Sequence, residues 1–363
     1  MSYYIVKSTA LKVDGTGAHD LLQQCFTNDL NACIGKSRSP IRPGRCVYGA
    51  FLSKNGGVID DILIYMLSDG QYMAVVNAGM GPDIALHLEN HLGQHDTTIT
   101  NMADRLGKID IQGPLSAQIL SNVLVDAEKA FDTLPYFSFK GHFDTHFPFG
   151  KAVCLKNGTT VLLSRTGYTG EFGFELFMPA DQAVAVWEAI VEAGDPIGLI
   201  ACGLAARDSL RSGAVLPLSH QDIGPWPFIN TPWSFALPFA ADGRHFTKSF
   251  IGDKALLEWE NPEYTHAFVG KDLRKVATKD PAIVIDKNGN EIGTVLTCVS
   301  DMGIGYVDGK IYSIASPDKP EGFKPRGLCC GFIKVKNRLN TDEVVQFILC
   351  EIDKARKKGA FPL

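Results

Sequence analysis

The chain has 363 residues, of which 45% are hydrophobic and 21% are charged, and its formal net charge is −5. This size predicts two or three packed domains, and the acidic balance argues against a nucleic-acid partner, because nucleic-acid binders carry a basic face. No stretch approaches the roughly 18 consecutive apolar residues of a membrane span, and residues 1–15 lack the pattern of a secretory signal, so we expect no membrane partner.

The cysteines indicate the compartment. The sequence holds 9 cysteines, an odd number, with no CxxC pair, and Cys329 and Cys330 are adjacent, which disfavours an ordinary bridge between them. This pattern is typical of free thiols in a reducing environment. We therefore expect a cytoplasmic protein whose cysteines are not paired.

The first half of the chain repeats one local order of elements. Residues 10–26, ALKVDGTGAHDLLQQCF, predict a strand, a glycine turn and a short helix. Residues 45–79 predict successive antiparallel strands, with KNGG and SDGQ as hairpin turns. Residues 105–124, RLGKIDIQGPLSAQILSNVL, again predict a strand, a turn and a helix. We therefore expect two related α+β subdomains.

A histidine stripe falls between these segments. Residues 82–96, PDIALHLENHLGQHD, have helical periodicity, and His87, His91 and His95 repeat every four residues. Such spacing could hold a transition metal. The stripe brings no cysteine, however, and a carboxylate ligand would have to come from Asp96, beyond the helix end. A solvated helix face is the favoured interpretation, and we predict no metal site.

The C-terminal third has a different character. Between residues 266 and 336, short apolar runs alternate with the turn sequences KDP, KNGN, VDGK and SPDKPEG, which predicts a small closed β-domain. Residues 341–359 predict a closing helix with Thr341 as its N-cap. We place the domain boundary after residue 243, so that residues 1–243 hold two intertwined α+β subdomains and residues 244–363 form a β-barrel domain with the closing helix.

Residues 164–179, SRTGYTGEFGFELFMP, combine glycines, aromatic residues and a carboxylate in one short segment. In a strand, Glu175 is either half exposed or buried with a partner, because a buried carboxylate alone would cost several kcal/mol. The glycines at positions 167, 170 and 173 could let a flat heterocycle approach the backbone. Glu175 would accept two parallel hydrogen bonds from it, and Tyr168 and the phenylalanines would stack on it. A tight hairpin with a surface glutamate is the alternative.

Three ordered blocks of sequence resemble a known family. They are GGVIDDILIY at residues 56–65, SRTGYTGEFGFE at 164–175 and GLAARDSLR at 203–211. These blocks resemble signatures of the glycine-cleavage T-protein (aminomethyltransferase) family, which binds tetrahydrofolate, and SFIGDKAL at 249–256 resembles the segment before its C-terminal barrel. The resemblance implies an α+β fold, with α+β subdomains around a central folate cavity and a small C-terminal β-barrel.

The resemblance also implies roles for individual residues. Asp61 matches the catalytic aspartate near folate N5, Glu175 matches the carboxylate that grips the pterin, and Arg207 matches an arginine of the folate pocket. The other matched pocket residues are Tyr48, Tyr65, Asn77 and Tyr168. Strand alternation directs Asp60 away from Asp61, so we expect one catalytic aspartate rather than a pair.

Departures from the family pattern lie on the substrate side. Gly213 stands where a glutamate is usual, WPFINTPWSF at residues 226–235 replaces another family segment, and the chain starts beyond the usual N-terminal segment. We therefore expect a demethylase-type enzyme that moves a methyl group from a small O-, N- or S-methylated donor to N5 of tetrahydrofolate. The alternatives are an aminomethyltransferase of glycine cleavage that acts with a lipoylated carrier protein, and a folate-binding protein without turnover.

Ether demethylation would require an acid for the leaving oxygen and an apolar donor pocket. His220 stands where the family usually has a glycine and is the candidate acid. Trp226 and Trp233 are candidates for the walls of the donor pocket. The alternatives are a polar loop position for the histidine and packing between domains for the tryptophans.

Overall fold

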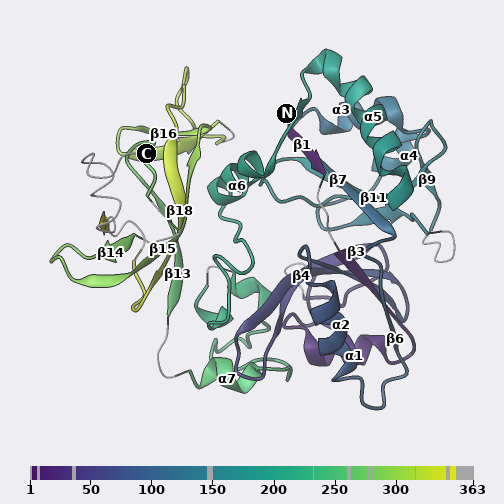
Figure 1. The fold of residues 1–363 in the computed structure, drawn as a ribbon, viewed down its shortest axis with the longest axis horizontal. Helices are drawn as coiled ribbons and strands as arrows, with labels where there is room; N and C mark the ends of the chain where they lie inside the picture. Colours follow the sequence, from purple (N-terminus) through teal and green to yellow (C-terminus); the bar gives the residue numbers. More distant parts are fainter. Residues whose placement is uncertain are drawn as a thin grey trace, which may run out of the picture. The chain divides into compact units, whose positions relative to one another are not determined.

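The structure is a computed structural model that describes residues 2–5, 9–34, 38–144, 150–231, 233–259, 263–276, 278, 282–314, 316–340 and 344–348. The chain forms two compact units (Figure 1). Unit 1 comprises Met1–Gly203 and Phe235–Leu257, and unit 2 comprises Leu204–Ser234 and Glu258–Leu363. The chain thus leaves unit 1 and returns to it, so residues 204–234 group with the C-terminal unit rather than with the segment before residue 243.

The first subdomain of unit 1 is a five-stranded antiparallel sheet, here called the first sheet, with the order β3-β4-β5-β2-β6. Its elements are β2 (Thr9–Asp14), α1 (Ala18–Cys25), β3 (Arg45–Leu52), β4 (Val58–Ser68), β5 (Gln71–Val76), α2 (Gly81–Glu89) and β6 (Thr98–Asn101). The KNGG and SDGQ hairpins form as predicted, because Gly56 and Gly70 supply the positive φ angles, 79° and 72°, that these turns need.

The second subdomain is a seven-stranded sheet, here called the second sheet, with the order β12-β1-β7-β11-β10-β8 and with β9 paired to β10. Its elements are β1 (Ser2–Ile5), β7 (Leu106–Gln112), α3 (Ser116–Val123), α4 (Ala127–Phe131), β8 (Phe139–Gly141), β9 (Val153–Cys154), β10 (Thr160–Ser164), β11 (Gly173–Pro179), η1 (Ala180–Gln182), α5 (Ala183–Gly194), η2 (Asp195–Ile197) and β12 (Ile200–Ala201). The predicted strand–turn–helix order is therefore present twice, as β2–α1 and β7–α3.

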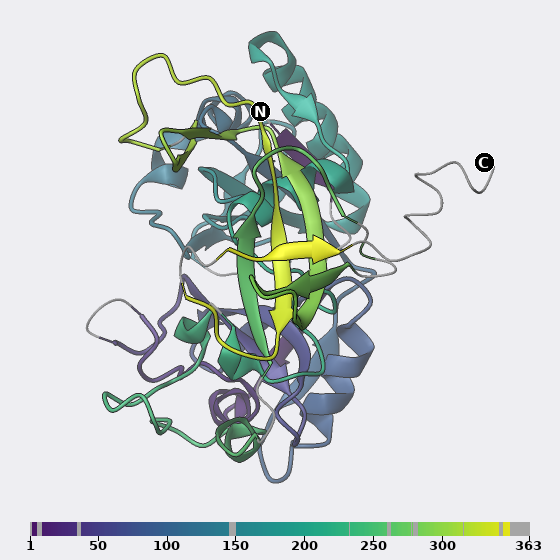
Figure 2. The same ribbon diagram turned by 90° about the vertical axis from the view of Figure 1, so that its left-hand side faces the viewer.

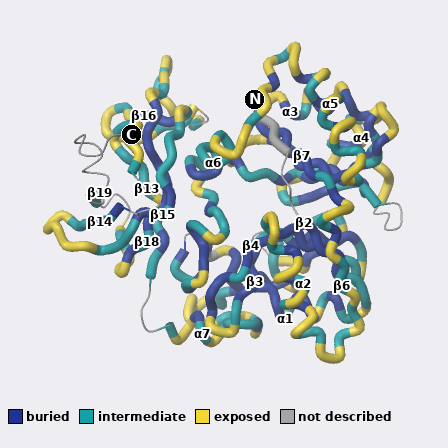
Figure 3. Tube along the Cα trace, in the orientation of Figure 1, coloured by how far each residue is buried: buried dark blue, intermediate teal, exposed yellow. Residues whose placement is uncertain are grey.

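Each sheet has one apolar face against helices and one face against the other sheet. Residues of α1 and α2 pack on the first sheet, and residues of α3 and α5 pack on the second (Figure 1). The remaining faces meet in a third cluster, which joins Tyr65 and Met73 of the first sheet to Phe139, Leu162 and Phe177 of the second. Figure 3 shows these strands as largely buried. Polar residues in this inter-sheet layer therefore lie inside unit 1.

Unit 2 is built on an antiparallel sheet with the order β13-β18-β15-β14-β19, drawn in green to yellow in Figure 2. Its elements are α6 (Leu204–Gly213), η3 (Phe228–Asn230), β13 (Tyr264–Val269), β14 (Ile283–Ile285), β15 (Glu291–Asp301), the hairpin β16 (Ile304–Val307) and β17 (Lys310–Ser313), β18 (Leu328–Val335) and β19 (Gln346–Ile348). Two further short helices are η4 (Ser234–Ala236), where the chain passes from unit 2 back to unit 1, and α7 (Asp253–Leu257) in unit 1. The α+β class and the C-terminal β-domain agree with the sequence prediction.

Two local predictions differ from the structure. Gln346–Ile348 form strand β19, paired with β14, where we predicted part of a closing helix, because an edge of the sheet offers hydrogen bonds that override helical periodicity. The rest of that prediction, including Thr341, lies outside the described residues. The helix of the histidine stripe ends at Glu89, so His91 and His95 follow it rather than share its face.

Two predictions concern compartment and membranes. The eight cysteines in the described part of the chain are all unpaired, as predicted. No helix in the described ranges is both long and apolar enough to cross a bilayer. The cytoplasmic location stays a prediction.

Candidate active site

A row of buried polar side chains crosses the inter-sheet layer of unit 1. On β7 the residues that alternate onto this face are Lys108, Asp110 and Gln112, and the register places them opposite Phe177, Glu175 and Gly173 of β11. All three polar residues of β7 are at most 9% exposed. Polar groups in an apolar layer are costly unless each is partnered, so this row is more typical of a binding site than of a core.

Glu175 lies at the centre of this row and is 3% exposed. Its Oε1 forms an ion pair with Lys108, whose ammonium is also 3.5 Å from Asp110, and its Oε2 accepts a hydrogen bond from the Thr166 hydroxyl. Burial acts to raise the pKa of Glu175, but the charge and hydrogen bond of Lys108, together with that of Thr166, lower it below its ordinary value. Glu175 is therefore a buried, partnered carboxylate, the second of the two states that the sequence allowed.

Tyr65 links this row to the first sheet. Its hydroxyl lies 3.1 Å from the hydroxyl of Ser164 and 3.2 Å from that of Thr166, which in turn donates to Glu175. Tyr65 is fully buried, and burial raises the pKa of its phenol, so the group is a neutral donor and acceptor. The predicted residues Tyr65 and Glu175 are thus joined by a short hydrogen-bond chain across the layer.

Asp61 forms a second cluster on β4. Tyr48 donates to its Oδ2 at 2.9 Å, and the Asn77 amide donates to its Oδ1 at 3.1 Å. The same amide donates to Asp60 at 2.8 Å, and the Asn77 main-chain N–H also donates to Asp60 at 2.9 Å. Asp60 is fully buried, whereas Asp61 is partly exposed, so the two carboxylates have different environments. A single catalytic aspartate stays a prediction.

The surroundings of Tyr48 bring further residues to this cluster. Burial raises the pKa of Tyr48, and the negative charge of Asp61 raises it further, which keeps the phenol protonated as a donor. Tyr168 also contributes to this shift, so its phenol lies near that of Tyr48. The ring of Phe235 is 5.7 Å from that of Tyr48, although Phe235 is 64% exposed. The last residue of the divergent WPFINTPWSF segment therefore contacts the Asp61 cluster.

The two clusters face the same layer. Asp61 and Tyr65 are four residues apart on one face of β4, a separation of about 13 Å at roughly 3.3 Å per residue. Tyr65 connects to Glu175 through Thr166. The described residues of unit 1 thus place two carboxylates, Asp61 on β4 and Glu175 on β11, on the same inter-sheet layer.

The glycines of residues 164–179 have a different role from the one predicted. A Cβ at Gly167 or Gly173 would come within 2.3 Å and 2.1 Å of the Gln112 side chain, so these glycines make room for Gln112 rather than for a ligand. Gly170 has a φ of 74°, which a turn requires. The predicted approach of a flat heterocycle to this backbone is therefore wrong at positions 167 and 173.

The phenylalanines of this segment also differ from the prediction. Phe174 and Phe177 are buried in two separate cores, and Phe172 is 42% exposed with the Arg165 guanidinium 4.1 Å from its ring. They support the strand rather than offer a free stacking face. Tyr168 stays the aromatic residue of the segment near the candidate site.

Sequence reasoning missed three residues of this candidate site: Lys108, Thr166 and Gln112. Gln112 donates to the carbonyls of Thr166 and Phe174, and its Oε1 is buried with no hydrogen-bond partner in the described part of the chain. A signal was present in the sequence, because KIDIQ places polar residues at alternate positions of an otherwise apolar strand.

The remaining predicted residues lie in unit 2. Arg207 is a partly buried residue of α6, and one turn later Arg211 is 1% exposed. Arg211 forms an ion pair with the fully buried Asp222 and donates to Asp208 at 2.7 Å and to Thr297 at 3.2 Å. Arg211 therefore stabilises unit 2, and sequence reasoning did not single it out.

The two tryptophans occupy contrasting places in unit 2. Trp233 is 4% exposed, donates to the Val215 carbonyl at 3.0 Å and packs on Phe332, which is the environment of a core residue rather than a pocket wall. Trp226 is partly exposed, with the Lys334 ammonium 4.5 Å from its ring centroid. Its place in a substrate pocket stays a prediction.

His220 is exposed and has a φ of 64°. This left-handed conformation favours glycine, which agrees with the family pattern at this position. Gly213, the other divergent position, would bring a Cβ within 2.0 Å of the Asp301 carboxylate. A glutamate side chain at position 213 would therefore collide with a like charge in this chain.

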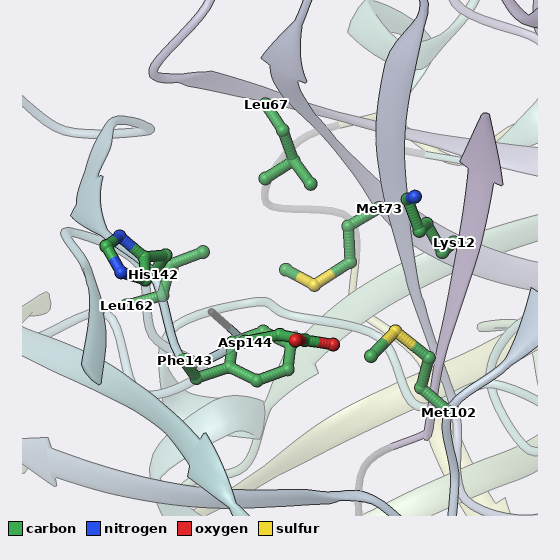
Figure 4. A pocket seen from close by; sticks show the side chains of 8 residues that line it. All are labelled: Lys12, Leu67, Met73, Met102, His142, Phe143, Asp144 and Leu162. Carbon is green, nitrogen blue, oxygen red and sulfur yellow. The ribbon is translucent and has the colours of Figure 1, made fainter. Parts of the chain in front are cut away.

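Two cavities lie away from these clusters. In unit 1, a cavity of about 20 Å³, enough for one water molecule, is lined by the residues labelled in Figure 4: Lys12, Leu67, Met73, Met102, His142, Phe143, Asp144 and Leu162. In unit 2, a cavity of about 730 Å³ is lined by β-domain residues that include Lys271, Arg274 and Arg326. The predicted site residues line neither of them.

Comparison with known proteins identifies the family. Residues 6–240 match the family described as the GCVT N-terminal domain. The chain belongs to this family. An aminomethyltransferase of Bacillus subtilis (strain 168) is 33% identical over 297 residues, 81% of this chain and 74% of that protein, and one of Halothermothrix orenii (strain H 168) is 32% identical over 342 residues, 92% and 84% of the two chains.

A solved structure has the same fold. The crystal structure of glycine cleavage system aminomethyltransferase T from Bartonella henselae superposes with a TM-score of 0.69 and covers 96% of this chain and 85% of that one, at 22% identity. The T-protein-like fold predicted from the sequence is therefore confirmed. Membership of the GCVT family also confirms the expected enzyme class, a folate-dependent transferase of one-carbon units.

The buried polar row of this family member holds acceptor atoms of the kind that a reduced pteridine requires. Such a ring carries adjacent N–H donors, and the unpartnered Oε1 of Gln112 is a buried acceptor on the strand next to Glu175. A carboxylate accepts up to about four hydrogen bonds, and Lys108, Thr166 and Asp110 contribute to those of Glu175. Acceptors for a ring with several donors are therefore present in the inter-sheet layer.

Proposed function

We propose that this protein is an aminomethyltransferase of the glycine-cleavage type, which transfers the one-carbon unit of an aminomethylated lipoyl carrier protein to tetrahydrofolate. The similarity of most of the chain to proteins named aminomethyltransferases supports this function. Aminomethyl transfer, the first of our alternatives, is therefore better supported than the demethylase activity that we expected from the divergent segments.

The observation that carries the proposal is the placement of two differently held carboxylates on the same inter-sheet layer. Glu175 is paired with Lys108 in the inter-sheet layer, and Asp61 is held by Tyr48 and Asn77 beside exposed surface. Glu175 would bind the ring inside the protein, and Asp61 would act nearer to solvent. This order suits a substrate whose ring end enters the protein first.

Glu175 and Gln112 would hold the ring. Their side-chain oxygens would accept from ring N–H groups, while Lys108 keeps the Glu175 carboxylate ionised. Charge-assisted hydrogen bonds of this kind are about twice as strong as neutral ones and fix orientation. The ring would thereby be positioned in the layer that Asp61 also faces.

Asp61 would stabilise the charge that develops during transfer. Bound tetrahydrofolate supplies N5 as the nucleophile for the incoming carbon. Tyr48 and Asn77 each donate to one oxygen of Asp61, which orients its carboxylate. A fixed anion beside developing positive charge lowers the barrier without reorganisation, and alignment of the reactants can contribute about 7–11 kcal/mol in favourable cases.

The experiment is incubation of the protein with tetrahydrofolate and an aminomethylated lipoyl carrier protein. Release of one ammonia per carbon transferred supports the proposal. Transfer from pooled methoxy-aromatic, methylamine or sulfonium compounds, with none from the carrier, would establish the demethylase instead.

The matched variants are Asp61→Asn and, as control, Asp83→Asn, an exposed carboxylate on α2. Asp61→Asn should lower the transfer rate at least about a hundredfold, as expected for loss of a transition-state electrostatic partner, and should retain folate affinity. Equal rates in the two variants would remove Asp61 from the chemistry.

A further inference from the structure

Three potential metal ligands meet on the outer side of the first sheet in unit 1, where α1 and α2 pack. Cys25 is the last residue of α1, His87 lies in the last turn of α2, and His91 follows that helix by two residues. Their ligand atoms all lie within 4.8 Å of one another. The sequence separates Cys25 from the histidines by about sixty residues, so only the packing of the two helices brings a thiol to the histidine stripe.

The cluster contains a buried nitrogen that needs a partner. Cys25 is fully buried, and the Nε2 atom of His87 is buried with no hydrogen-bond partner in the described ranges. The rings of Phe51 and His91 pack on His87, with centroids at 5.6 Å and 4.8 Å. An unsatisfied imidazole nitrogen in such surroundings is destabilising, and a bound ion would give it a partner.

His91 is oriented as a metal ligand. Its Nδ1 lies 2.7 Å from the main-chain oxygen of His87. A carbonyl can only accept, so Nδ1 carries the proton and Nε2 holds the lone pair. Metal-ligating histidines have this arrangement, in which the second ring nitrogen donates to a carbonyl and fixes the tautomer. The Lys248 ammonium donates to the carbonyls of Gln23 and Phe26 near Cys25.

We propose that Cys25, His87 and His91 bind one Zn²⁺ ion that ties α1 to α2. Zinc bonds of about 2.0–2.3 Å in a tetrahedral site place ligand atoms about 3.3–3.7 Å apart. Side-chain rotations that move the ligand atoms by about 1 Å therefore complete the site. Binding converts the Cys25 thiol to a thiolate and releases its proton to solvent. Water takes the fourth position through the partly exposed side of His91.

The thiolate and two imidazoles set the metal class. Soft sulfur and borderline nitrogen ligands suit Zn²⁺ and disfavour Mg²⁺ and Ca²⁺, which prefer oxygen. The site joins two helices that cover one face of the first sheet, so its effect is on the stability of unit 1. It requires no part of the folate site.

The experiment is metal titration of the full-length protein after treatment with a chelator. Co²⁺ serves as the probe, because its thiolate complex absorbs in the near ultraviolet, and Zn²⁺ is then added as competitor. We expect one metal ion per chain, a thiolate–cobalt band that Zn²⁺ abolishes, and a higher unfolding temperature with Zn²⁺. Mg²⁺ should not compete.

Three variants identify the ligands. Cys25→Ser should lose the band. His91→Gln, at a partly exposed position that folding tolerates, should weaken Zn²⁺ binding at least about tenfold. The control is His95→Gln, because His95 belongs to the same stripe but contacts Gln24 instead, at 3.3 Å. Circular dichroism confirms that each variant folds.

Several outcomes would overturn the site. One is wild-type protein that shows no thiolate–cobalt band at millimolar metal. Another is a folded Cys25→Ser protein that keeps the band. If Cys25→Ser does not fold, Zn²⁺ affinity in His91→Gln equal to that in His95→Gln is decisive against the proposal.

Discussion

Replacement of Glu175 by glutamine removes the charge at the centre of the buried polar row and keeps its shape. Loss of one partner from a buried ion pair typically costs about 3–5 kcal/mol. In this variant Lys108 still has the Asp110 carboxylate as a charge partner, at 3.5 Å, and the new amide oxygen can still accept a hydrogen bond from Thr166. We therefore expect Glu175→Gln to lower the free energy of unfolding by about 2–3 kcal/mol and the melting temperature by about 4–12 °C, at roughly 2–4 °C per kcal/mol.

The pH dependence has a definite sign. The folded-state pKa of Glu175 lies below its ordinary value of 4.5, so its stabilising contribution is complete above that pH and is lost as the pH falls through the folded pKa. The difference between wild type and Glu175→Gln should be constant from pH 8 to about pH 5 and should shrink only at lower pH. Urea unfolding across this range measures it.

A triple variant separates stability from binding. Lys108→Met together with Glu175→Gln and Asp110→Asn replaces the whole buried charge cluster by neutral groups, and such replacements often restore stability. The free energy of unfolding should therefore recover in the triple variant, while tetrahydrofolate affinity, measured by calorimetry, should stay at least about tenfold weaker than in wild type, because the ring has lost its carboxylate. Wild-type folate affinity in either variant would refute the binding role of Glu175, and unchanged stability of the single variant would refute the pairing argument.

Further substitutions test other contacts by urea or thermal unfolding. Asn77→Ala removes the amide donor to the fully buried Asp60 and should cost about 1–3 kcal/mol; no loss would mean that water replaces the amide. Arg211→Met leaves the buried carboxylate of Asp222 without its guanidinium and should cost about 3–5 kcal/mol, and wild-type stability would contradict this pairing. His220→Gly relieves a left-handed conformation and should stabilise the protein by up to about 1 kcal/mol; a marked loss of stability would show that the imidazole makes an essential contact.

The sequence by itself determined the local elements and the family. The hairpins at KNGG and SDGQ and the two strand–turn–helix segments follow from apolar periodicity and from glycines where positive φ is needed, and both are properties of neighbouring residues. Three short blocks were enough to identify the folate-dependent transferase family. Tyr48, Asp61 and Asn77 were also predicted together, and the structure joins them by hydrogen bonds.

The tertiary structure decided which distant side chains contact one another. Lys108 meets Glu175 because β7 and β11 pair in one register, and the same register brings Gln112 against the glycines that we had assigned to a ligand. Cys25 reaches His87 and His91 only because α1 and α2 pack side by side on one sheet. Periodicity tells which face of an element is buried, but it does not tell which distant side chain shares that face. Strand register and helix packing set these contacts, and both depend on the free energy of the whole fold rather than on any local stretch of sequence.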